Sequence, residues 1–448
     1  MRKFISDKET SLILRNFYKK FPIISHGTGV YLYDTEGKEY IDAVSGAFVV
    51  SLGHSNRDII NNIYEQMKRV SYVNGNHFVS ESALELSKRL KEYGKVIGLD
   101  SSFFLSSGSE AVEAAVKLAR QIWYEKGFKK KHKIITRSPS YHGNTLYALS
   151  LSGRPHYKEC YEPLLSEVIT LTTPYKYRPV GNEYNYKEYI DELERLINKN
   201  GSDTISALIL EPIGGSSSIA SIPPEGYMES LQEICKKNNI LIIADEVLCG
   251  SYRCGEFFAS QQVGLKPDIL TLGKGINGGY APLSVLMTRS EHLETIKDNG
   301  RNFLHAQTYV HMPIAVSAGL AVVEEFKKQN IISNVSDVGN YFLSNIKSKI
   351  LNMNHVGCIS GKGMLLGVEI VKDKEEKEPF PRAEKVTEKI IENAFERGLI
   401  LWPNVGHVNG VDGDGILLAP PLITTNEEIN KIIVLLKETL ENYFQENL

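Results

Sequence analysis

Short apolar runs alternate with longer amphipathic segments between about residue 60 and residue 325 of this 448-residue chain. Such short runs are typical of strands that are buried on both faces of a parallel sheet. The longer segments repeat their apolar side chains every three or four residues, as amphipathic helices do. The alternation therefore predicts an α/β sheet with right-handed crossovers. The predicted strands are Ser102–Leu105, Lys133–Thr136, Ala207–Leu210, Ile240–Ala244, Asp268–Thr271 and Leu283–Leu286, and two of the predicted helices are Ser109–Lys126 and Gly226–Lys237.

The two ends of the chain show a different pattern. Residues 29–41 alternate apolar and polar side chains around the turn Thr35–Lys38, which predicts a β-hairpin. The segment Met364–Val371 predicts a strand, and Thr425 with Glu428 forms a capping-box pattern before a final helix. We therefore expect residues 60–325 to form a large domain. We expect residues 1–59 and 326–448 to form one smaller α+β domain together.

Composition restricts the partners of the protein. Hydrophobic residues make up 42% and charged residues 23% of the chain, which is ordinary for a globular protein. The net charge of -3 gives no electrostatic reason to expect nucleic acid or an anionic membrane as a partner. No apolar run reaches the ~18 residues of a membrane span. The first ten residues contain no apolar stretch of signal-peptide length.

The cysteines and one basic run carry less information. The five cysteines are scattered and include no CxxC pair, which argues against a zinc site and favours a reducing compartment. We therefore expect a cytoplasmic protein without a bound metal. The basic run Lys129–Lys133 has the composition of a solvated helix end, and we interpret it as one.

Polar or glycine-rich segments follow five of the predicted strands, at the point where each strand ends. Because ligands of open α/β sheets bind at the carboxyl ends of the strands, we expect these segments to meet at one edge. Five separate stretches of the chain therefore contribute to one predicted site. They are Ser106–Glu110, Ser140–Gly143, Glu211–Pro212, Asp245–Val247 and Gly273–Gly275.

Lys274 and Asp245 restrict the chemistry of this site most. Lys274 lies between Gly273 and Gly275, where the backbone leaves room for a ligand to approach the amine. Asp245 ends an apolar strand, and a buried carboxylate there requires a cation, a salt bridge or a proton. A lysine that forms a Schiff base and an aspartate that meets a protonated ring nitrogen together fit pyridoxal phosphate. We therefore predict this cofactor, with Lys274 and Asp245 as catalytic residues and a lowered Lys274 pKa.

The other segments of the predicted site could hold the rest of the cofactor. Ser107–Ser109 opens a helix, where hydroxyls and N–H groups can bind an anion. Ser107 and Glu110 also fit a plain capping box. Tyr141 could lie flat on the cofactor ring or be a surface tyrosine. His142 beside it has no definite role from the sequence.

Together these segments resemble class III (omega-type) pyridoxal-phosphate-dependent aminotransferases. The motifs of this resemblance are, in order, Ser107–Ala115, Ser140–Gly143, Glu211–Pro212, Pro223–Tyr227, Asp245–Val247 and Gly273–Gly275, with Tyr40–Asp42, Leu52–His54 and Ala419–Leu422 towards the ends of the chain. The resemblance implies fold type I: a large domain with a mostly parallel sheet flanked by helices, and a smaller α+β domain. It also implies a homodimer whose active sites are shared between the subunits.

The resemblance further implies a role for each matching residue. One residue, Thr308, is implied to reach the phosphate in the partner subunit. The remaining cofactor-binding residues are Gly108 and Ser109 at the phosphate beside Ser107, Tyr141 and Val247 on the two faces of the ring, Asp245 at the ring nitrogen and Lys274 in the Schiff base, with His142 and Glu211 next to them.

Four positions depart from the pattern with which relatives bind a substrate carboxylate. Some relatives place a glutamate at one of these positions, and others place an arginine at one of the remaining three. This chain has Ser216 at the glutamate position, and Trp402, Leu417 and Ser360 at the arginine positions.

The usual carboxylate receptor is therefore missing or has moved. Arg154 and Arg253 are the two candidates for a moved receptor, and they join Ser216, Trp402 and Leu417 as candidate substrate-pocket residues. A tryptophan and a leucine predict an apolar wall, and the tryptophan could also lie over an ammonium group. We therefore expect a donor whose far end is apolar or cationic.

The residues and the resemblance together predict an aminotransferase that moves an amino group from an amine or amino acid donor to a keto acid acceptor. Lys274 would transfer the proton between the donor carbon and the cofactor. An aminomutase, epimerase or decarboxylase on the same scaffold remains an alternative, because one fold can host several reactions. A pyridoxal-phosphate-binding regulator is disfavoured, because the sequence has no basic region and little room for a DNA-binding module before the hairpin.

Overall fold

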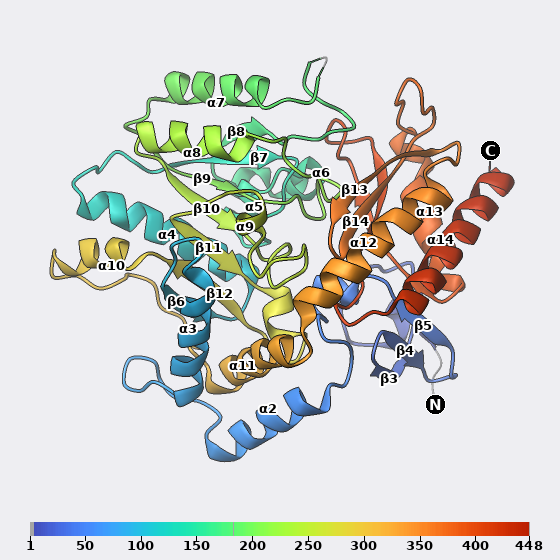
Figure 1. Cartoon of the computed structure of the whole chain (residues 1–448), viewed down its shortest axis with the longest axis horizontal. Coiled ribbons are helices and arrows are strands. Elements are labelled where there is room, and N and C mark those ends of the chain that lie inside the picture. Colours follow the sequence, from blue (N-terminus) through green and yellow to red (C-terminus); the bar gives the residue numbers. More distant parts are fainter. Residues whose placement is uncertain (1–3, 182, 448) are drawn as a thin grey trace.

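A seven-stranded sheet forms the centre of the larger part of the molecule in the computed structural model (Figure 1). The structure describes residues 4–181 and 183–447. Residues 1–3, which belong to the predicted small domain and to the N-terminal segment without a signal-peptide pattern, lie outside the described residues, and so does Leu448. From one edge to the other, the strands are β6 (Ser101–Leu105), β12 (Ser284–Thr288), β11 (Ile269–Leu272), β10 (Leu241–Asp245), β9 (Ile205–Leu210), β7 (Lys133–Ser138) and β8 (Ile169–Thr172).

The strand directions place the carboxyl ends of six of these strands at one edge. Neighbouring strands are parallel except where β12 pairs antiparallel with both β11 and β6. The mostly parallel α/β sheet predicted from the sequence is therefore confirmed, and each of the six predicted runs is a strand. Strand β8 was not predicted, because its apolar residues alternate with threonines instead of forming a continuous apolar run.

Helices cover both faces of the seven-stranded sheet (Figure 1). One face carries α4, α5 and α10, and the other carries α3, α7 and α8. The predicted helices correspond to α4 and α8. The α-helices are α1 (Ser45–Phe48), α2 (Arg57–Arg69), α3 (Glu81–Gly94), α4 (Gly108–Glu125), α5 (Leu146–Leu151), α6 (Pro155–Lys158), α7 (Lys187–Asn200), α8 (Tyr227–Lys237), α9 (Ala259–Gln262), α10 (Ser290–Lys297), α11 (Pro313–Lys328), α12 (Ile331–Ile350), α13 (Val386–Glu396) and α14 (Asn426–Asn447). Within residues 4–181 and 183–447, none of the helices is long and apolar enough to cross a membrane.

Short 3-10 helices and two four-stranded sheets complete the architecture. The 3-10 helices are η1 (Asp7–Glu9), η2 (Glu159–Leu164), η3 (Lys274–Asn277) and η4 (Arg382–Glu384). One sheet has the order β13 (Val356–Lys362), β14 (Leu365–Ile370), β17 (Asp414–Leu418), β16 (Trp402–Val405). The other has the order β15 (Leu399–Ile400), β5 (Glu39–Asp42), β4 (Tyr31–Asp34), β3 (Ile24–Thr28), and a two-stranded pair joins β1 (Phe4–Ile5) to β2 (Phe21–Pro22).

The two ends of the chain meet in the second of these sheets. Strands β4 and β5 form the predicted antiparallel hairpin, and β15 pairs in parallel with β5. Strand β14 corresponds to the predicted strand Met364–Val371. The predicted capping box also forms, because the Thr425 N–H donates to the Glu428 carboxylate at 2.8 Å and Thr425 Oγ1 accepts the Glu428 N–H at 3.3 Å.

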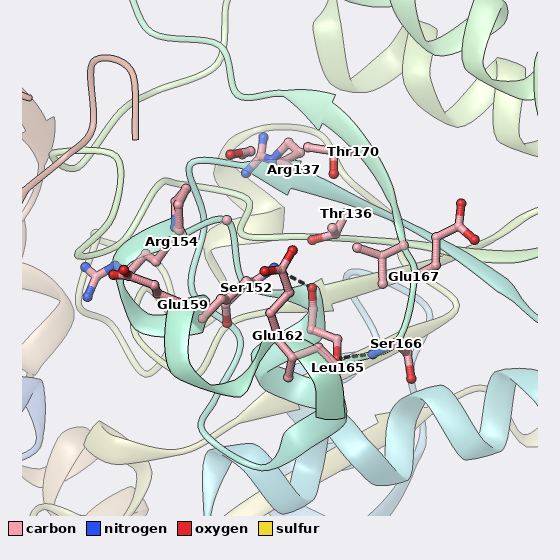
Figure 2. Close-up of a pocket in the computed structure, with 16 residues that line it drawn as sticks. Thr136, Arg137, Ser152, Arg154, Glu159, Glu162, Leu165, Ser166, Glu167 and Thr170 are labelled. Atoms are coloured by element: carbon pink, nitrogen blue, oxygen red, sulfur yellow. Dashed lines mark hydrogen bonds between the residues drawn. The ribbon is translucent and has the colours of Figure 1, made fainter. Parts of the chain in front are cut away.

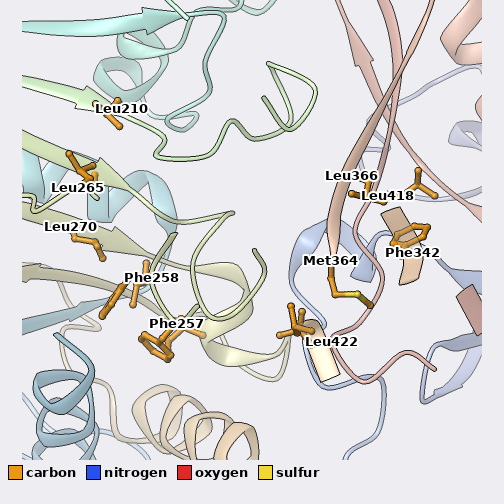
Figure 3. Packing of buried hydrophobic residues seen from close by; sticks show 14 of the residues in the cluster. Leu210, Phe257, Phe258, Leu265, Leu270, Phe342, Met364, Leu366, Leu418 and Leu422 are labelled. Atoms are coloured by element: carbon orange, nitrogen blue, oxygen red, sulfur yellow. The ribbon is translucent and has the colours of Figure 1, made fainter. Parts of the chain in front are cut away.

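A single apolar cluster extends from the seven-stranded sheet to the four-stranded sheet that contains β14 and β17 (Figure 3). On the side of the large sheet it contains Leu210, Leu270 and Phe258, and on the other side it contains Met364 and Leu418. All of these side chains are fully buried. Burial of a leucine or phenylalanine side chain contributes roughly 1.5–3 kcal/mol, so this continuous cluster holds the two sheets together.

Lys131 differs from the solvated helix end that its basic surroundings suggest. Its side chain is only 2% exposed, and its ammonium donates to the carbonyls of Ser202, Ile205 and Asn239 at 2.8, 2.8 and 2.7 Å. The ammonium also lies 4.7 Å from the centre of the Trp123 ring. A buried lysine therefore links α4 to the turns that precede β9 and β10.

The substitution Lys131→Met should lower the free energy of unfolding by about 3 kcal/mol, because it leaves several buried carbonyls without a donor. Urea denaturation followed by circular dichroism measures this change. Lys130→Met is the matched control, because the Lys130 ammonium is exposed and lies 3.9 Å from Asp203. We expect that variant to keep wild-type stability. Equal midpoints for Lys131→Met and wild type would show that the carbonyls are satisfied in another way.

Candidate active site

The carboxyl ends of β6, β7, β9, β10 and β11 surround a cavity of about 160 Å³. Polar residues from the strand ends and the loops after them line it, as expected for a parallel sheet. The predicted site segments meet at this cavity, and every predicted cofactor-binding residue lines it except Ser107 and Thr308. The lining residues are Gly108, Ser109, Tyr141, His142, Gly143, Glu211, Ser216, Asp245, Val247, Leu248 and Lys274.

The start of α4 lies at one side of the cavity. Ser107 is its N-cap residue, and Ser107 Oγ accepts the N–H of Glu110 at 3.3 Å. The Glu110 carboxylate in turn accepts the N–H groups of Ser106 and Ser107, each at 2.9 Å. The capping box considered in the sequence analysis therefore forms. The N–H groups of the first turn have no acceptor within the helix, so the start of α4 can also bind an anion.

Val247 packs against Gly108 and Gly273, and neither position leaves room for a larger residue. A Cβ atom on Gly108 would lie 2.8 Å from Val247 Cγ1, and a Cβ atom on Gly273 would lie 3.0 Å from the same methyl group. Contacts this short are not tolerated without movement. The glycines therefore allow α4 and the Lys274 loop to close around one branched side chain.

Asp245 ends β10 and is only 4% exposed. Its Oδ2 lies 2.7 Å from Nδ1 of His142, which is also buried. Its Oδ1 accepts the N–H of Val247 at 3.1 Å and the hydroxyl of Thr271 at 3.2 Å. These donors hold the carboxylate in one orientation at the cavity wall. His142, to which the sequence assigned no definite role, is therefore one of the three groups that orient Asp245.

Lys274 opens the 3-10 helix η3 with a backbone φ of 45°, which is unusual for a residue other than glycine. Its amine lies 5.4 Å from the centre of the Phe48 ring. Burial lowers the pKa of the Lys274 amine, while the charges of Asp245 and Glu211 oppose this shift. The direction agrees with the sequence-based expectation. A lowered pKa increases the fraction of the amine that is unprotonated, and therefore nucleophilic, at a given pH.

Glu211 and Tyr141 also line the cavity. The buried Glu211 carboxylate accepts the N–H of Gly215 at 3.1 Å and, at 3.4 Å, the N–H of Tyr141. Burial raises the pKa of the Glu211 carboxyl group. Burial also raises the pKa of the Tyr141 hydroxyl. Glu211 therefore ties the backbone at Gly215 to the backbone at Tyr141.

An apolar cluster lies behind Leu248, which lines the cavity. It contains the fully buried Leu417, the buried Phe48 and the half-buried Trp402. Trp402 pairs with Leu417 across β16 and β17, and its ring lies 5.1 Å from the Phe48 ring. The structure thus brings Trp402 and Leu417 together as an apolar group. Phe48 and Leu248 were missed from the sequence, where only their closeness to the Leu52–His54 and Asp245–Val247 motifs could have indicated them.

The two candidate arginines have different surroundings. Arg253 is buried, and its guanidinium donates to the carbonyls of Met364 and Pro420 and to Ser45 Oγ, away from the cavity. Burial lowers the pKa of Arg253 to about 10. Arg154 instead donates to Ser216, which lines the cavity. The geometry therefore does not favour Arg253 as a carboxylate receptor.

Thr308 lies outside the cavity of its own chain. It occupies an exposed turn, where its carbonyl accepts the hydroxyl of Tyr72 at 3.0 Å. Ser360, at one of the positions that differ from relatives, donates its hydroxyl to the carbonyl of Ile219 and does not line the cavity. Within a single chain, Thr308 therefore lies outside the cavity.

A lysine and an aspartate at the carboxyl edge of such a sheet define a class of protein, and comparison with known proteins identifies it. The family model for class III aminotransferases matches residues 15–440. The chain belongs to this family, and it is an aminotransferase of fold type I.

Similar proteins support this assignment over almost the whole chain. The aminotransferase YodT of Bacillus subtilis is 34% identical over 96% of this chain and 97% of its own length. The acetylornithine aminotransferase of Aquifex aeolicus is 34% identical over 95% of this chain and 99% of its own. The solved (S)-enantioselective omega-transaminase of Thermomicrobium roseum superposes with a TM-score of 0.89 at 35% identity, covering 97% and 96% of the two chains.

The contact of Gly108 with Val247 can be tested by a double-mutant cycle. Gly108→Ala should lower kcat/KM about tenfold, because the added methyl group forces Val247 to move at a cost of roughly 1–3 kcal/mol. Adding Val247→Ala should restore a large part of that loss. Transaminase assays of the two single variants and the double variant measure the coupling. Purely additive effects of the two substitutions would contradict the contact.

Proposed function

We propose that this aminotransferase uses pyridoxal phosphate at the cavity of the carboxyl edge and transfers an amino group from an amine with an apolar or cationic far end to a keto acid. The observation that carries the proposal is the presence of the Lys274 amine in the same cavity as the buried Asp245–His142 pair. A nucleophilic amine and a fixed carboxylate are the two groups that this cofactor requires of a protein.

The residues around the cavity fit the cofactor. Gly108 and Ser109 line the cavity at the start of α4, where first-turn N–H groups favour a phosphate. Tyr141 and Val247, also in the lining, supply flat and apolar surface for a ring. Three donors hold the Asp245 carboxylate at the cavity wall, where it would stabilise a proton on the ring nitrogen.

These contacts suggest separate roles for the cofactor, Lys274 and His142. Bound pyridoxal phosphate supplies an electron-withdrawing ring that makes the carbon next to the substrate nitrogen acidic. Lys274 would attach the cofactor and, once released, take the proton from the donor carbon with its amine. Burial lowers the pKa of the Lys274 amine, which supports its role in accepting the proton, because only the unprotonated amine can accept one. His142 would hold Asp245 in place throughout.

The donor preference rests on the apolar cluster of Phe48, Leu248, Trp402 and Leu417. A carboxylate placed against such a surface would lose its hydration without gaining a partner. An aliphatic or aromatic end would gain from burial instead, and an ammonium could lie over the Trp402 ring.

We also propose a homodimer whose active sites are shared. The exposed position of Thr308 supports this, because one chain leaves that residue outside its own cavity. Large exposed apolar side chains in the neighbouring segments, such as Tyr64, Phe78, Leu304 and Tyr309, would be covered by a second copy. The pairing of β15 with β5 supports one small domain formed by residues 1–59 and 326–448, beside a large domain of residues 60–325.

A cytoplasmic location is part of the same proposal. It is supported by the five cysteines, which are all free in the structure. Three of them are buried, as expected of reduced, packed thiols.

The substitution Lys274→Ala tests the proposed function directly. We expect wild-type protein to carry out net amino transfer from an amine to pyruvate, and borohydride to fix the cofactor on Lys274. The variant should lose covalent attachment and should lose activity by about 10³-fold or more, because it lacks the proton-transferring amine. Peptide mass spectrometry and alanine formation measure the two effects. The exposed Lys266 provides the control Lys266→Ala. Covalent attachment that survives in Lys274→Ala would refute the assignment.

Donor preference can be measured with matched amines. Butylamine and gamma-aminobutyrate have the same chain length and differ in a methyl group against a carboxylate. With pyruvate as acceptor, we expect kcat/KM for butylamine to exceed that for gamma-aminobutyrate by about tenfold or more, because the carboxylate would be buried without a partner. A clear preference for gamma-aminobutyrate or glutamate would show that the apolar cluster does not face the donor.

A further inference from the structure

Arg154 is a buried cation at the edge of the catalytic cavity. It lies between α5 and α6, in the wall of a neighbouring cavity of about 630 Å³ (Figure 2). Its guanidinium lies 5.3 Å from the ring centres of both Tyr141 and Tyr157. Because Tyr141 lines the catalytic cavity, the charge of Arg154 lies directly behind that wall.

The hydrogen bonds of Arg154 lead to the same place. Nε donates to Ser217 Oγ at 2.7 Å, and Nη2 donates to the Ser216 carbonyl at 2.7 Å and to Ser216 Oγ at 3.1 Å. Ser216 itself lines the catalytic cavity. The Tyr157 side chain is a further hydrogen-bond partner of the guanidinium. The guanidinium is therefore held by neutral hydroxyl and carbonyl oxygens.

Arg154 has no carboxylate partner for its charge. Glu211 is near enough to act on it through space, but no ion pair with Arg154 is present within residues 4–181 and 183–447. Buried charges normally have an opposite charge or a full set of hydrogen bonds. Neutral serine oxygens stabilise a guanidinium less than a carboxylate does. The position is thus suited to an anion that arrives with a ligand.

Three other cations of the described residues are buried, and they are used differently. Arg137 donates to the backbone carbonyl of Glu211, a residue that lines the catalytic cavity. The Lys131 ammonium donates to the carbonyls of three separate turns, and Arg253 donates to Met364, Pro420 and Ser45. Neither residue lines the catalytic cavity or donates to a residue that does. Of these four buried cations, Arg154 is the one that donates to a side-chain oxygen of a cavity-lining residue, Ser216 Oγ.

We propose that Arg154 binds the carboxylate of the keto acid acceptor and thereby selects keto acids over aldehydes. This inference rests on the proposed function and deepens it. The guanidinium would exchange Ser216 or Ser217 for the two carboxylate oxygens, which match its fork in geometry and charge. Loss of two serine hydroxyl contacts is a small change, because those groups are neutral and can turn to other partners.

The proposal also explains how one site serves two unlike substrates. The apolar cluster behind Leu248 accepts the far end of the donor, whereas Arg154 lies on the side of Tyr141 and Ser216. The carboxylate of a keto acid is joined directly to its reacting carbon, so its receptor must lie close to the reaction centre. The two recognition elements therefore occupy different walls and do not compete.

The test compares two acceptors that differ only in the carboxylate. Pyruvate and acetaldehyde share a methyl group and a reacting carbonyl, and the holoenzyme is assayed with butylamine as donor. Arg154→Met should lower the ratio of kcat/KM for pyruvate to kcat/KM for acetaldehyde by about 10- to 100-fold, because hydrogen bonds to a charged group are lost. Arg154→Lys, which keeps the charge without the fork, should fall between Arg154→Met and wild type. Propanoate should inhibit the acetaldehyde reaction of wild type more strongly than that of Arg154→Met.

Arg15→Met is the matched control, because Arg15 is an exposed arginine whose charge also acts on Tyr141. We expect its ratio and its propanoate inhibition to match wild type. Equal losses for both acceptors in Arg154→Met would mean that Arg154 only supports the fold, and an unchanged ratio would place the receptor elsewhere. A loss in Arg15→Met without a loss in Arg154→Met would also overturn the proposal. Wild-type protein that transfers to neither acceptor would instead refute the proposed function.

Discussion

The cost of burying charge shapes the carboxyl edge of the seven-stranded sheet. Asp245, Glu211 and Lys274 all lie around one small cavity, where an unpaired ion would be unfavourable by several kcal/mol. Each carboxylate is therefore surrounded by donors: His142, Thr271 and a backbone N–H at Asp245, and backbone N–H groups at Glu211. These donors come from different strands and loops. The strand order of the sheet must be correct before any of the three ionisable groups is tolerable.

Strained backbone collects around the same cavity. Lys274 has a positive φ, and so do Ser45, Phe48 and Ser251 in the segments next to it. Such conformations cost about 1–3 kcal/mol each and persist only where the surrounding structure holds them. Arg253 supplies part of that support, because its guanidinium joins the Ser45 segment to the loop that carries Ser251. An arginine that the sequence suggested as a receptor thus stabilises the backbone that positions Phe48 beside the lysine.

Much of the fold and the site could be predicted because the information is local. Continuous apolar runs mark the buried strands, and the residues directly after them line the cavity. The contact between His142 and Asp245 could not be predicted in this way. β9 lies between β7 and β10 in the sheet, so the loop after β7 must cross a strand whose position depends on the whole topology. Lys131 was misinterpreted for a related reason, because its carbonyl partners come from turns that only the folded chain brings together.

The contacts around Ser216 on the substrate side of the cavity are the hardest part of the site to predict from the sequence, because they join segments that lie far apart in the chain. Ser216 accepts donors from two distant segments, the Arg154 guanidinium through its oxygens and the Asn404 amide through its carbonyl. None of these three segments has a periodic pattern or a strand end that would mark it. A glutamate at position 216 would pair with Arg154 and neutralise it, whereas a serine holds the guanidinium and leaves its charge uncompensated. The identity of one small residue therefore decides whether the nearest arginine is a structural ion pair or a receptor.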